Sequence, residues 1–174
     1  ISNAVFGVGT NNPDKIGKGV TKYYGKGEDG FNISSCQFAL HYFFKDMETL
    51  KGFMRNISEC TRVGGYFIGT TYDGSEVFNL LKKKKEGESV QIVENGEKVW
   101  EIVKGYGKAE FEDNSTSLGY RIDVYQETIN QLIPEYLVNF DYLNRVMENY
   151  GFQILTDREA EQIGFHHGSG SFRE

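Results

Sequence analysis

Apolar side chains recur with two different periods in the second quarter of the chain, and the order of these periods predicts the fold. Residues 31–37 alternate apolar and polar side chains, which is typical of a strand, whereas residues 47–62 repeat them at the spacing of a helix buried on one face. Glycines 64 and 65 are expected to end that helix, and residues 66–70 to form a second strand before a second helix. This strand, helix, strand, helix order favours parallel strands in an α/β sheet.

The middle third of the chain alternates with the strand period alone. Residues 89–93 and 99–103 read as two strands, and the Asn95-Gly96 pair between them is a good hairpin signal. Residues 117–125 alternate in the same way. We therefore predict an antiparallel β insertion, or an extension of the sheet, after the parallel part.

The two ends of the chain carry shorter signals. Residues 4–8 predict a short buried strand, and residues 9–30, rich in Gly, Asn, Lys and Asp, predict a long loop. Toward the C-terminus the pattern predicts a helix ended by Gly151, a final strand, a short helix and a mobile tail, over residues 141–150, 152–155, 156–163 and 168–171.

The composition narrows the class of protein further. The chain has 174 residues, which suits one globular domain, and its formal net charge of −6 argues against a generally basic nucleic-acid surface. No apolar run approaches the roughly 18 residues that a membrane helix needs. Two cysteines make no disulfide framework and no signal peptide is recognisable, so we expect an intracellular, reducing compartment.

The segment over residues 34–44 is the richest in candidate chemistry, because it starts where a predicted parallel strand ends. Ligands of open α/β sheets bind outside the carboxyl ends of the strands. Gln37, His41 and Tyr42 offer an amide, an imidazole and a phenol there, beside the aromatic ring of Phe38. Such groups can hydrogen-bond a polar heterocycle while rings stack on it. The alternative is the start of a hydrophobic helix with incidental polar groups.

A second candidate is Glu135, which follows Pro134 among apolar neighbours. A carboxylate beside apolar walls can accept two N–H donors from a guanine edge, as acidic side chains do when they read amine donors on bases. The alternative is an exposed carboxylate in a turn.

Three weaker signals have simpler explanations. The run Lys82, Lys83, Lys84 and Lys85 is either a solvated helix end or a patch that faces RNA phosphates. Residues 25–30 match the spacing of a phosphate-binding glycine loop, but a strand follows them instead of a helix. The pair His166-His167 has no Cys or acidic residue at ligand spacing, so no metal is expected.

Three segments of the chain resemble those of the mRNA cap (guanine-N7) methyltransferases in order and spacing. They are Cys-Gln-Phe-Ala-Leu-His-Tyr at residues 36–42, Val-Gly-Gly-Tyr-Phe-Ile-Gly-Thr-Thr at residues 63–71 and Pro-Glu-Tyr-Leu-Val at residues 134–138. Residues 72–81 look most like the forms found in the capping enzymes of large DNA viruses. The resemblance covers about residues 31–155.

This resemblance implies a class I, S-adenosylmethionine-dependent methyltransferase with a Rossmann-like sheet, which methylates N7 of the guanosine cap. No metal and no general base is implied, because N7 carries a lone pair and no proton; the enzyme aligns the reacting atoms. Glu135 would hold the guanine N1 and N2 donors. The residues implied to bind the methyl donor are Gln37, Phe38 and Tyr42, and those implied to bind the cap are His41, Tyr42, Tyr120 and Glu135.

The chain departs from the family pattern at its start, where the glycine-rich first motif that cradles the methyl donor does not occur. We therefore expect a partial Rossmann-like fold that matches the C-terminal two-thirds of the family domain. Its expected parts are a loop-rich start, a βαβα core, an antiparallel cap-facing insertion, and a C-terminal helix and strand with a mobile tail, over residues 1–30, 31–87, 88–139 and 140–174.

The resemblance also implies partners and a place of action. The substrate would be the capped 5′ end of an RNA (GpppN), and guanylyltransferase and triphosphatase domains could share the polypeptide. A cellular enzyme would act in the nucleus, and a viral one in the cytoplasm or viral factory. Two alternatives remain: a non-catalytic cap-binding or stimulatory module, and a methyltransferase for another substrate, against which Glu135 argues.

Overall fold

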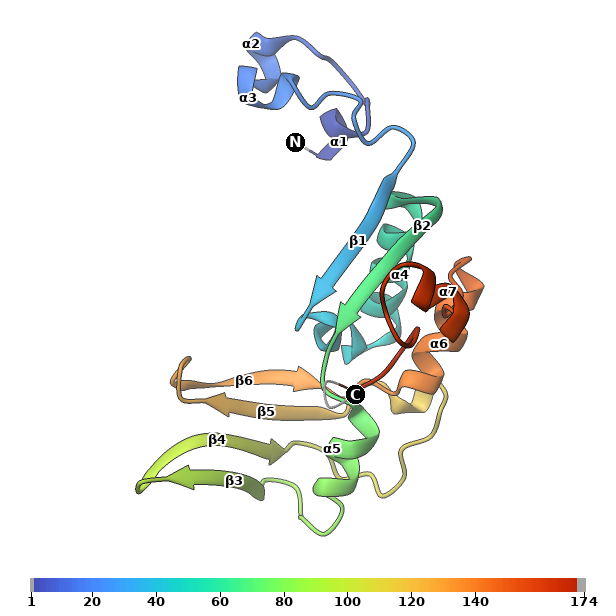
Figure 1. Cartoon of the computed structure of the whole chain (residues 1–174). Coiled ribbons are helices and arrows are strands. Elements are labelled where there is room, and N and C mark those ends of the chain that lie inside the picture. The colour runs from blue at the N-terminus through green and yellow to red at the C-terminus, as the bar shows by residue number, and fades with distance from the viewer. Residues whose placement is uncertain (1, 172–174) are drawn as a thin grey trace.

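The computed structural model describes residues 2–171 and contains two separate sheets, one parallel and one antiparallel (Figure 1). Strand β1 (Phe31–Gln37) pairs in parallel with β2 (Thr61–Thr70). The second sheet has the order β3-β4-β5-β6 and is antiparallel throughout. Its strands are β3 (Ser89–Glu94), β4 (Glu97–Lys104), β5 (Arg121–Gln126) and β6 (Gln131–Tyr136). The predicted α/β class with an antiparallel insertion is confirmed.

The crossover between the two parallel strands is helical, as predicted. A short 3₁₀ helix, η1 (Leu40–Lys45), leads into α4 (Met47–Cys60). Asp46 caps α4 by accepting a hydrogen bond from the Thr49 backbone N–H at 2.8 Å. The buried face of α4 packs with η1 and with α6 (Phe140–Asn149) in one core, formed by Leu40, Phe44, Leu50, Phe53, Met54, Ile57, Val138, Tyr142 and Leu143.

The expected end of α4 at Gly64-Gly65 is wrong. Strand β2 begins directly after the helix, at Thr61, and both glycines lie inside it. A Cβ at Gly65 would lie 2.9 Å from the carbonyl oxygens of Arg62 and Phe31, so only glycine fits this close approach. The register of β1 against β2 shifts between Phe31 and Ile33. The glycine pair therefore allows an irregularity in the pairing of β1 with β2, and it does not end the helix.

The antiparallel sheet has a core of its own against α5 (Gly74–Leu80). The predicted hairpin is confirmed as β3 and β4, and the predicted third strand begins later, at Arg121, because a 3₁₀ turn (Ser115–Ser117) precedes it. The buried members of this core are Val77, Phe78, Leu81, Ile102, Tyr106, Tyr120, Ile122, Val124 and Leu137.

Strand β6 was not predicted, because Pro134 interrupts its pattern. Proline has no N–H for a ladder, and it is tolerated mainly on edge strands. Among the described strands β6 is such an edge strand, paired with β5 alone, where Pro134 lies opposite Asp123. The same register places Glu135 opposite Ile122. Both members of this pair are buried, so Glu135 points to the face of the sheet that carries the core.

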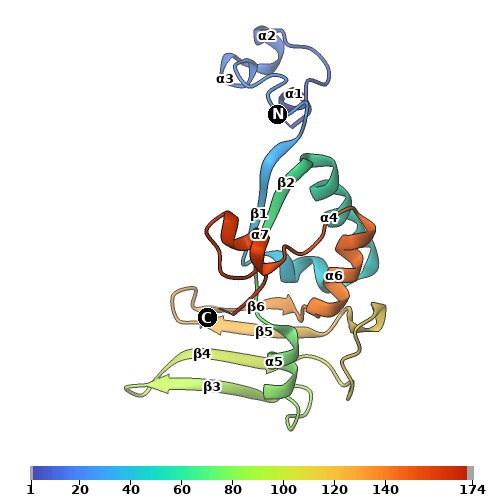
Figure 2. The same ribbon diagram turned by 45° about the vertical axis from the view of Figure 1, so that its right-hand side comes forward.

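At the N-terminus the predicted strand over residues 4–8 is wrong. Residues Ser2–Val5 form a helical turn, α1, in which Ala4 is buried. The expected loop contains two more helical turns, α2 (Pro13–Ile16) and α3 (Lys18–Thr21). Figure 2 shows all three beyond the start of β1, away from both sheets. Here the apolar run was too short for its period to separate a strand from a helix.

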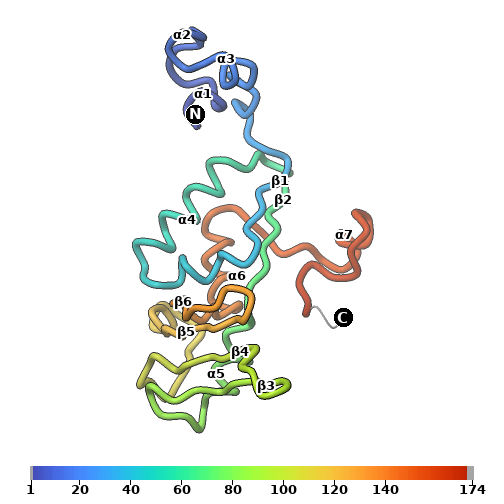
Figure 3. Tube along the Cα trace, turned by 90° about the vertical axis from the view of Figure 1, so that its left-hand side faces the viewer, coloured from blue at the N-terminus to red at the C-terminus, as the bar shows by residue number. Residues whose placement is uncertain are grey.

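At the C-terminus the predicted helix is confirmed as α6, and Gly151 follows its end with a φ of 83°. The predicted strand over residues 152–155 is wrong, because this segment pairs with no strand in the described part of the chain. The next predicted helix is confirmed as α7 (Asp157–Gln162). In Figure 3, α4 and α7 lie on opposite sides of the parallel strands. The tail over residues 168–171, which we expected to be mobile, lies within the described residues without a helix or strand, and Gly168 and Ser169 line a pocket together with Leu155. Its mobility stays a prediction.

Candidate functional site

Two predicted donor-binding residues lie at the carboxyl end of β1. The Gln37 amide donates to Ser35 Oγ at 2.9 Å, and its Oε1 accepts a hydrogen bond from Thr70 Oγ1 at 2.8 Å. Phe38 has a φ of 49°, which is unusual for an aromatic residue, and 62% of it is exposed. Its backbone N–H donates to the Thr70 carbonyl at 2.9 Å. Thr70 thus fixes the backbone turn that presents both residues.

His41 and Tyr42 follow on η1, with opposite exposure. The His41 imidazole is only 5% exposed, whereas Tyr42 is 43% exposed. The two rings meet edge to face, with 4.3 Å between their centroids. Burial raises the pKa of the Tyr42 phenol, and the nearby Glu135 carboxylate raises it further. Tyr42 therefore stays a neutral phenol at the mouth of the site.

Glu135 reaches this region from β6, in the other sheet. Its Oε1 lies 3.6 Å from His41 Nε2, which is within the range of an ion pair but long for a hydrogen bond. Glu135 is 9% exposed. His41 Nε2 and Glu135 Oε2 are both buried without a hydrogen-bond partner. Buried polar atoms without hydrogen-bond partners cost about 1–3 kcal/mol each, so this pair is a candidate for contact with a ligand.

Burial also sets the charges of this pair. It lowers the pKa of His41 to about 4 and raises the pKa of Glu135 to about 7. Both shifts disfavour the charged form, so the two groups are not held as a permanent ion pair. Above pH 7 the site holds a neutral imidazole beside a carboxylate.

This arrangement has a definite recognition pattern. A neutral imidazole with its proton on Nε2 is a donor, and the two oxygens of Glu135 are acceptors. Together they offer one donor followed by two acceptors. The complementary ligand edge has one acceptor followed by two donors, and guanine presents O6, N1–H and N2–H in that order.

The remaining predicted site residues are Tyr120 and the four lysines at residues 82–85. Tyr120, at 2% exposure, packs in the antiparallel core, and its hydroxyl donates to the Glu110 carbonyl. Its ring borders a shallow hollow at the segment before β5, lined by Lys108, Ala109, Glu110, Glu112, Thr116 and Tyr120. Residues 82–85 follow α5, and all but the half-buried Lys84 are exposed. The structure therefore brings together Gln37, Phe38, His41, Tyr42 and Glu135. Tyr120 lies on the same face of the antiparallel sheet, opposite Leu137 and diagonal to Glu135, with its side chain in the core. The lysines lie beyond the end of α5.

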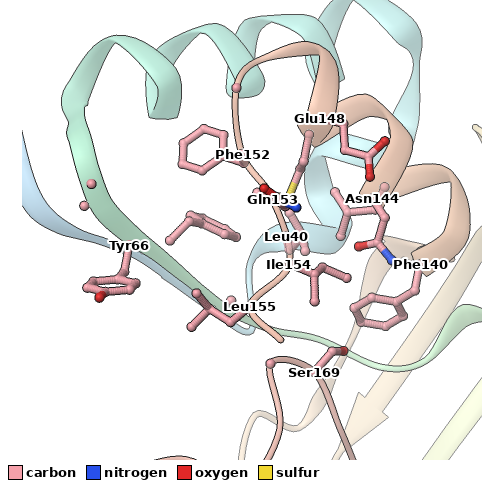
Figure 4. Close-up of a pocket in the computed structure, with 18 residues that line it drawn as sticks. Leu40, Tyr66, Phe140, Asn144, Glu148, Phe152, Gln153, Ile154, Leu155 and Ser169 are labelled. Atoms are coloured by element: carbon pink, nitrogen blue, oxygen red, sulfur yellow. The ribbon is translucent and has the colours of Figure 1, made fainter. Parts of the chain in front are cut away.

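A pocket of about 370 Å³ lies behind this cluster, between β2, α6 and the extended segment after α6 (Figure 4). Its walls are largely apolar, with Phe140, Leu143, Met147 and Phe152 among them. Leu40 of η1 also lines it, but none of the five clustered residues does. The pocket is a neighbour of the candidate site and not the site itself.

Among the described residues, no three His, Cys, Asp or Glu side chains are grouped so that they could hold a metal ion. His167 Nδ1 lies 3.1 Å from Asp157 Oδ1, as an exposed pair. None of the helices in residues 2–171 is both long and apolar enough to span a bilayer.

Two residues of the site were missed in the sequence. Thr70 and Thr71 contact Gln37, Phe38 and His41; Thr70 ends β2 as Gln37 ends β1, and Thr71 follows directly after the strand. A pair of hydroxyl residues at the carboxyl end of a predicted parallel strand is the signal that could have revealed them.

The fold is that of an α/β protein, and the cluster of candidate residues lies at the carboxyl ends of its parallel strands. The chain belongs to the mRNA (guanine-N(7))-methyltransferase domain family, whose model matches residues 2–167. The resemblance seen in the sequence is thereby confirmed.

Curated relatives agree with this family. The chain is 32% identical over 142 residues to the mRNA cap guanine-N(7) methyltransferase of Drosophila melanogaster, covering 79% of this chain and 31% of that protein. It is 30% identical over 131 residues to a probable mRNA-capping enzyme of Acanthamoeba polyphaga mimivirus, covering 72% of this chain and 11% of that protein. It is 29% identical over 126 residues to the mRNA cap guanine-N(7) methyltransferase of Saccharomyces cerevisiae, covering 72% of this chain and 29% of that protein. The matched part spans about a third or less of these relatives.

Proposed function

We propose that this chain reads the guanine of an mRNA cap and contributes to methyl transfer from S-adenosylmethionine to its N7. The observation that carries the proposal is the buried pair of His41 Nε2 and Glu135 Oε2, neither of which has a hydrogen-bond partner among the described residues. Guanine would satisfy both: O6 accepts from Nε2–H, and N1–H and N2–H donate to the carboxylate. Family membership and the names of the relatives support the same reading.

The methyl donor would lie beside this pair, at the carboxyl end of β1. The exposed Phe38 ring and the Gln37 amide suit the flat, polar adenosyl group, and Tyr42 follows them on η1, directly after His41. When bound, S-adenosylmethionine supplies the methyl group from a positively charged sulfur. Gln37, Phe38 and Tyr42 would hold it.

The chain's own residues would act by positioning and electrostatics. N7 attacks with its lone pair, so no side chain needs to remove a proton. His41 and Glu135 would hold the base so that N7 faces the donor, which is the entropic part of catalysis. Positive charge moves from the sulfur to the purine as the methyl group is transferred. A Glu135 carboxylate on the N1–N2 edge stabilises that charge where it develops.

The remaining predicted residues enter the proposal with smaller roles. Tyr120, whose side chain is committed to the core, would support the cap-facing sheet from within. Residues 82–85 would offer exposed lysines to the RNA phosphates. The division of the chain into a start, a βαβα core, a cap-facing insertion and a C-terminal part is likewise proposed.

The partner would be the capped 5′ end of an RNA. Triphosphatase and guanylyltransferase domains in one polypeptide are proposed from the likeness to a viral capping enzyme, of which this chain matches 11%. The place of action would be the nucleus in a cell, or the cytoplasm or viral factory for a virus.

The second candidate is a module that binds the cap, or stimulates another subunit, without catalysis. One observation favours it: the two buried atoms without hydrogen-bond partners that carry the proposal, His41 Nε2 and Glu135 Oε2, both belong to the proposed guanine side of the site and not to the donor side. Guanine reading is common to both candidates, and methyl transfer separates them.

Calorimetric titration of the chain with GpppG and with ApppA tests the guanine reading. Adenine presents a donor where guanine has O6 and an acceptor where guanine has N1–H, so it opposes both His41 and Glu135. We expect GpppG to bind about 10- to 100-fold more tightly, which corresponds to roughly 1–3 kcal/mol. Repeating the titration with S-adenosylhomocysteine reports on the donor side. Equal affinity for the two dinucleotides would remove the proposed role of the pair.

A further inference from the structure

We propose that Thr71 is a positioning residue that keeps the proton of His41 on Nε2. In this tautomer the imidazole Nε2–H can donate a hydrogen bond to the ligand. The Glu135 carboxylate accepts hydrogen bonds from the same edge of the ligand. The ligand in this inference rests on the proposed function, whereas the tautomer is a property of the chain alone and can be measured without any ligand.

The geometry places one group on each nitrogen of the ring. Thr71 Oγ1 lies 3.4 Å from His41 Nδ1, and Glu135 Oε1 lies 3.6 Å from Nε2. The imidazole is buried, so water does not freely replace either neighbour. The tautomer is therefore decided by these two contacts.

The two contacts favour one arrangement. A carboxylate only accepts hydrogen bonds, so a lone pair on Nε2 would face negative charge, whereas a proton on Nε2 is attracted to it. With the proton on Nε2, Nδ1 is an acceptor. The Thr71 hydroxyl can rotate to donate to it, and a hydroxyl is the group needed at this position.

The preceding residue makes this role specific to Thr71. Thr70 Oγ1 donates to Gln37 Oε1 at 2.8 Å and accepts from the Phe38 N–H at 3.1 Å. Consecutive threonines at the end of β2 thus serve different partners: Thr70 holds the turn after β1, and Thr71 faces the imidazole. Thr70 is therefore a matched control with the same side chain one residue away.

Long-range ¹H–¹⁵N correlation spectra of the full chain test the tautomer directly. The chain has three histidines, and His41→Gln identifies the signals of His41. At pH 8, where Glu135 is a carboxylate, we expect His41 to be protonated on Nε2 alone. Thr71→Val keeps the shape and removes the hydrogen bond to Nδ1, and it should make the Nδ1–H form detectable as a minor population, because the Glu135 carboxylate still favours the proton on Nε2. Thr71→Ser should restore the wild-type spectrum, and Thr70→Val should leave the His41 tautomer unchanged.

Affinity for GpppG supplies the functional readout. Thr71→Val should weaken binding by about fivefold, in line with the loss of one hydrogen-bonded arrangement, while Thr71→Ser should stay within about twofold of wild type. A wild-type His41 protonated on Nδ1 would overturn the inference, as would a Thr71→Val spectrum identical to wild type. If no variant or wild-type chain binds GpppG, the proposed function fails while the tautomer result still decides the role of Thr71.

Discussion

Replacing Glu135 by glutamine is expected to make the chain more stable and, at the same time, to weaken its binding of GpppG. Glu135 is a buried carboxyl group whose second oxygen has no partner. Glutamine has nearly the same shape but carries no charge. The substitution therefore removes a cost of folding together with the two acceptors that we propose for guanine. Binding sites often retain groups that destabilise the folded chain because function needs them, which is the usual trade-off between stability and function.

The gain in stability has a definite pH dependence. The pKa of Glu135 is about 7 in the folded chain against 4.5 for an ordinary glutamate, so the folded state holds the extra proton between these values. Wild-type stability therefore falls as the pH rises from 4.5 through 7. Glu135→Gln does not titrate, and we expect its free energy of unfolding to exceed that of wild type by about 2–3 kcal/mol at pH 8. The difference should vanish near pH 4, and urea denaturation at both pH values measures it.

The expected loss of binding has a different cause. An amide offers one acceptor and one donor, so its NH₂ would face a guanine N–H. We expect the affinity for GpppG to fall by about 10- to 100-fold, or roughly 1–3 kcal/mol, by calorimetry. Glu127→Gln, on the exposed turn between β5 and β6, is the matched control and should change neither quantity. Unchanged affinity in Glu135→Gln would exclude Glu135 as the guanine reader.

Gly74→Ala is expected to destabilise the chain by about 3 kcal/mol, by overpacking against backbone that cannot move aside. Gly74 begins α5, and its N–H donates to the Val138 carbonyl at 3.0 Å. A Cβ at Gly74 would lie 2.7 Å from the backbone N and C of Val138, and it would meet the carbonyl oxygen as well. Val138 is buried and lies three residues after Glu135. The overpacking would therefore strain the contact between α5 and the segment that carries Glu135.

Gly52→Ala gives the opposite result by the same substitution. Gly52 lies on the exposed side of α4, and a Cβ there would meet nothing within 4 Å. Alanine is the better helix former, so we expect a gain of about 0.5–1 kcal/mol. Chemical denaturation of both variants measures the contrast. A Gly74→Ala chain as stable as wild type would show that α5 does not pack on Val138 as described.

The sequence predicted those parts of the fold whose signals are long or chemically distinctive. The helix over Met47–Cys60 has several turns of spacing and a capping Asp46, and the hairpin has an Asn-Gly turn. The short apolar runs over residues 4–8 and 152–155 do not form the strands that their patterns predict. A strand depends on a pairing partner, which its own residues do not specify. Pro134 concealed β6, since its edge position became visible only with the sheet order.

The residue types of the site could be predicted, but their contact could not. His41 and Glu135 stand 94 positions apart and belong to η1 and to β6, an element that the sequence did not reveal. Their 3.6 Å separation depends on the β5–β6 register, in which a slip of one residue would turn Glu135 to the other face. The pKa of each group follows from burial, which is a property of the packed structure.

The most direct test of the account is transfer of a labelled methyl group from S-adenosylmethionine to GpppG, followed by digestion of the product and identification of the methylated nucleoside. The account predicts 7-methylguanosine as the only labelled nucleoside, no labelling of ApppA, and much slower labelling with Glu135→Gln. Label at another position of the guanosine, or equal labelling of ApppA, would contradict it. Binding of GpppG without any transfer would contradict catalysis by this chain and favour the cap-binding module.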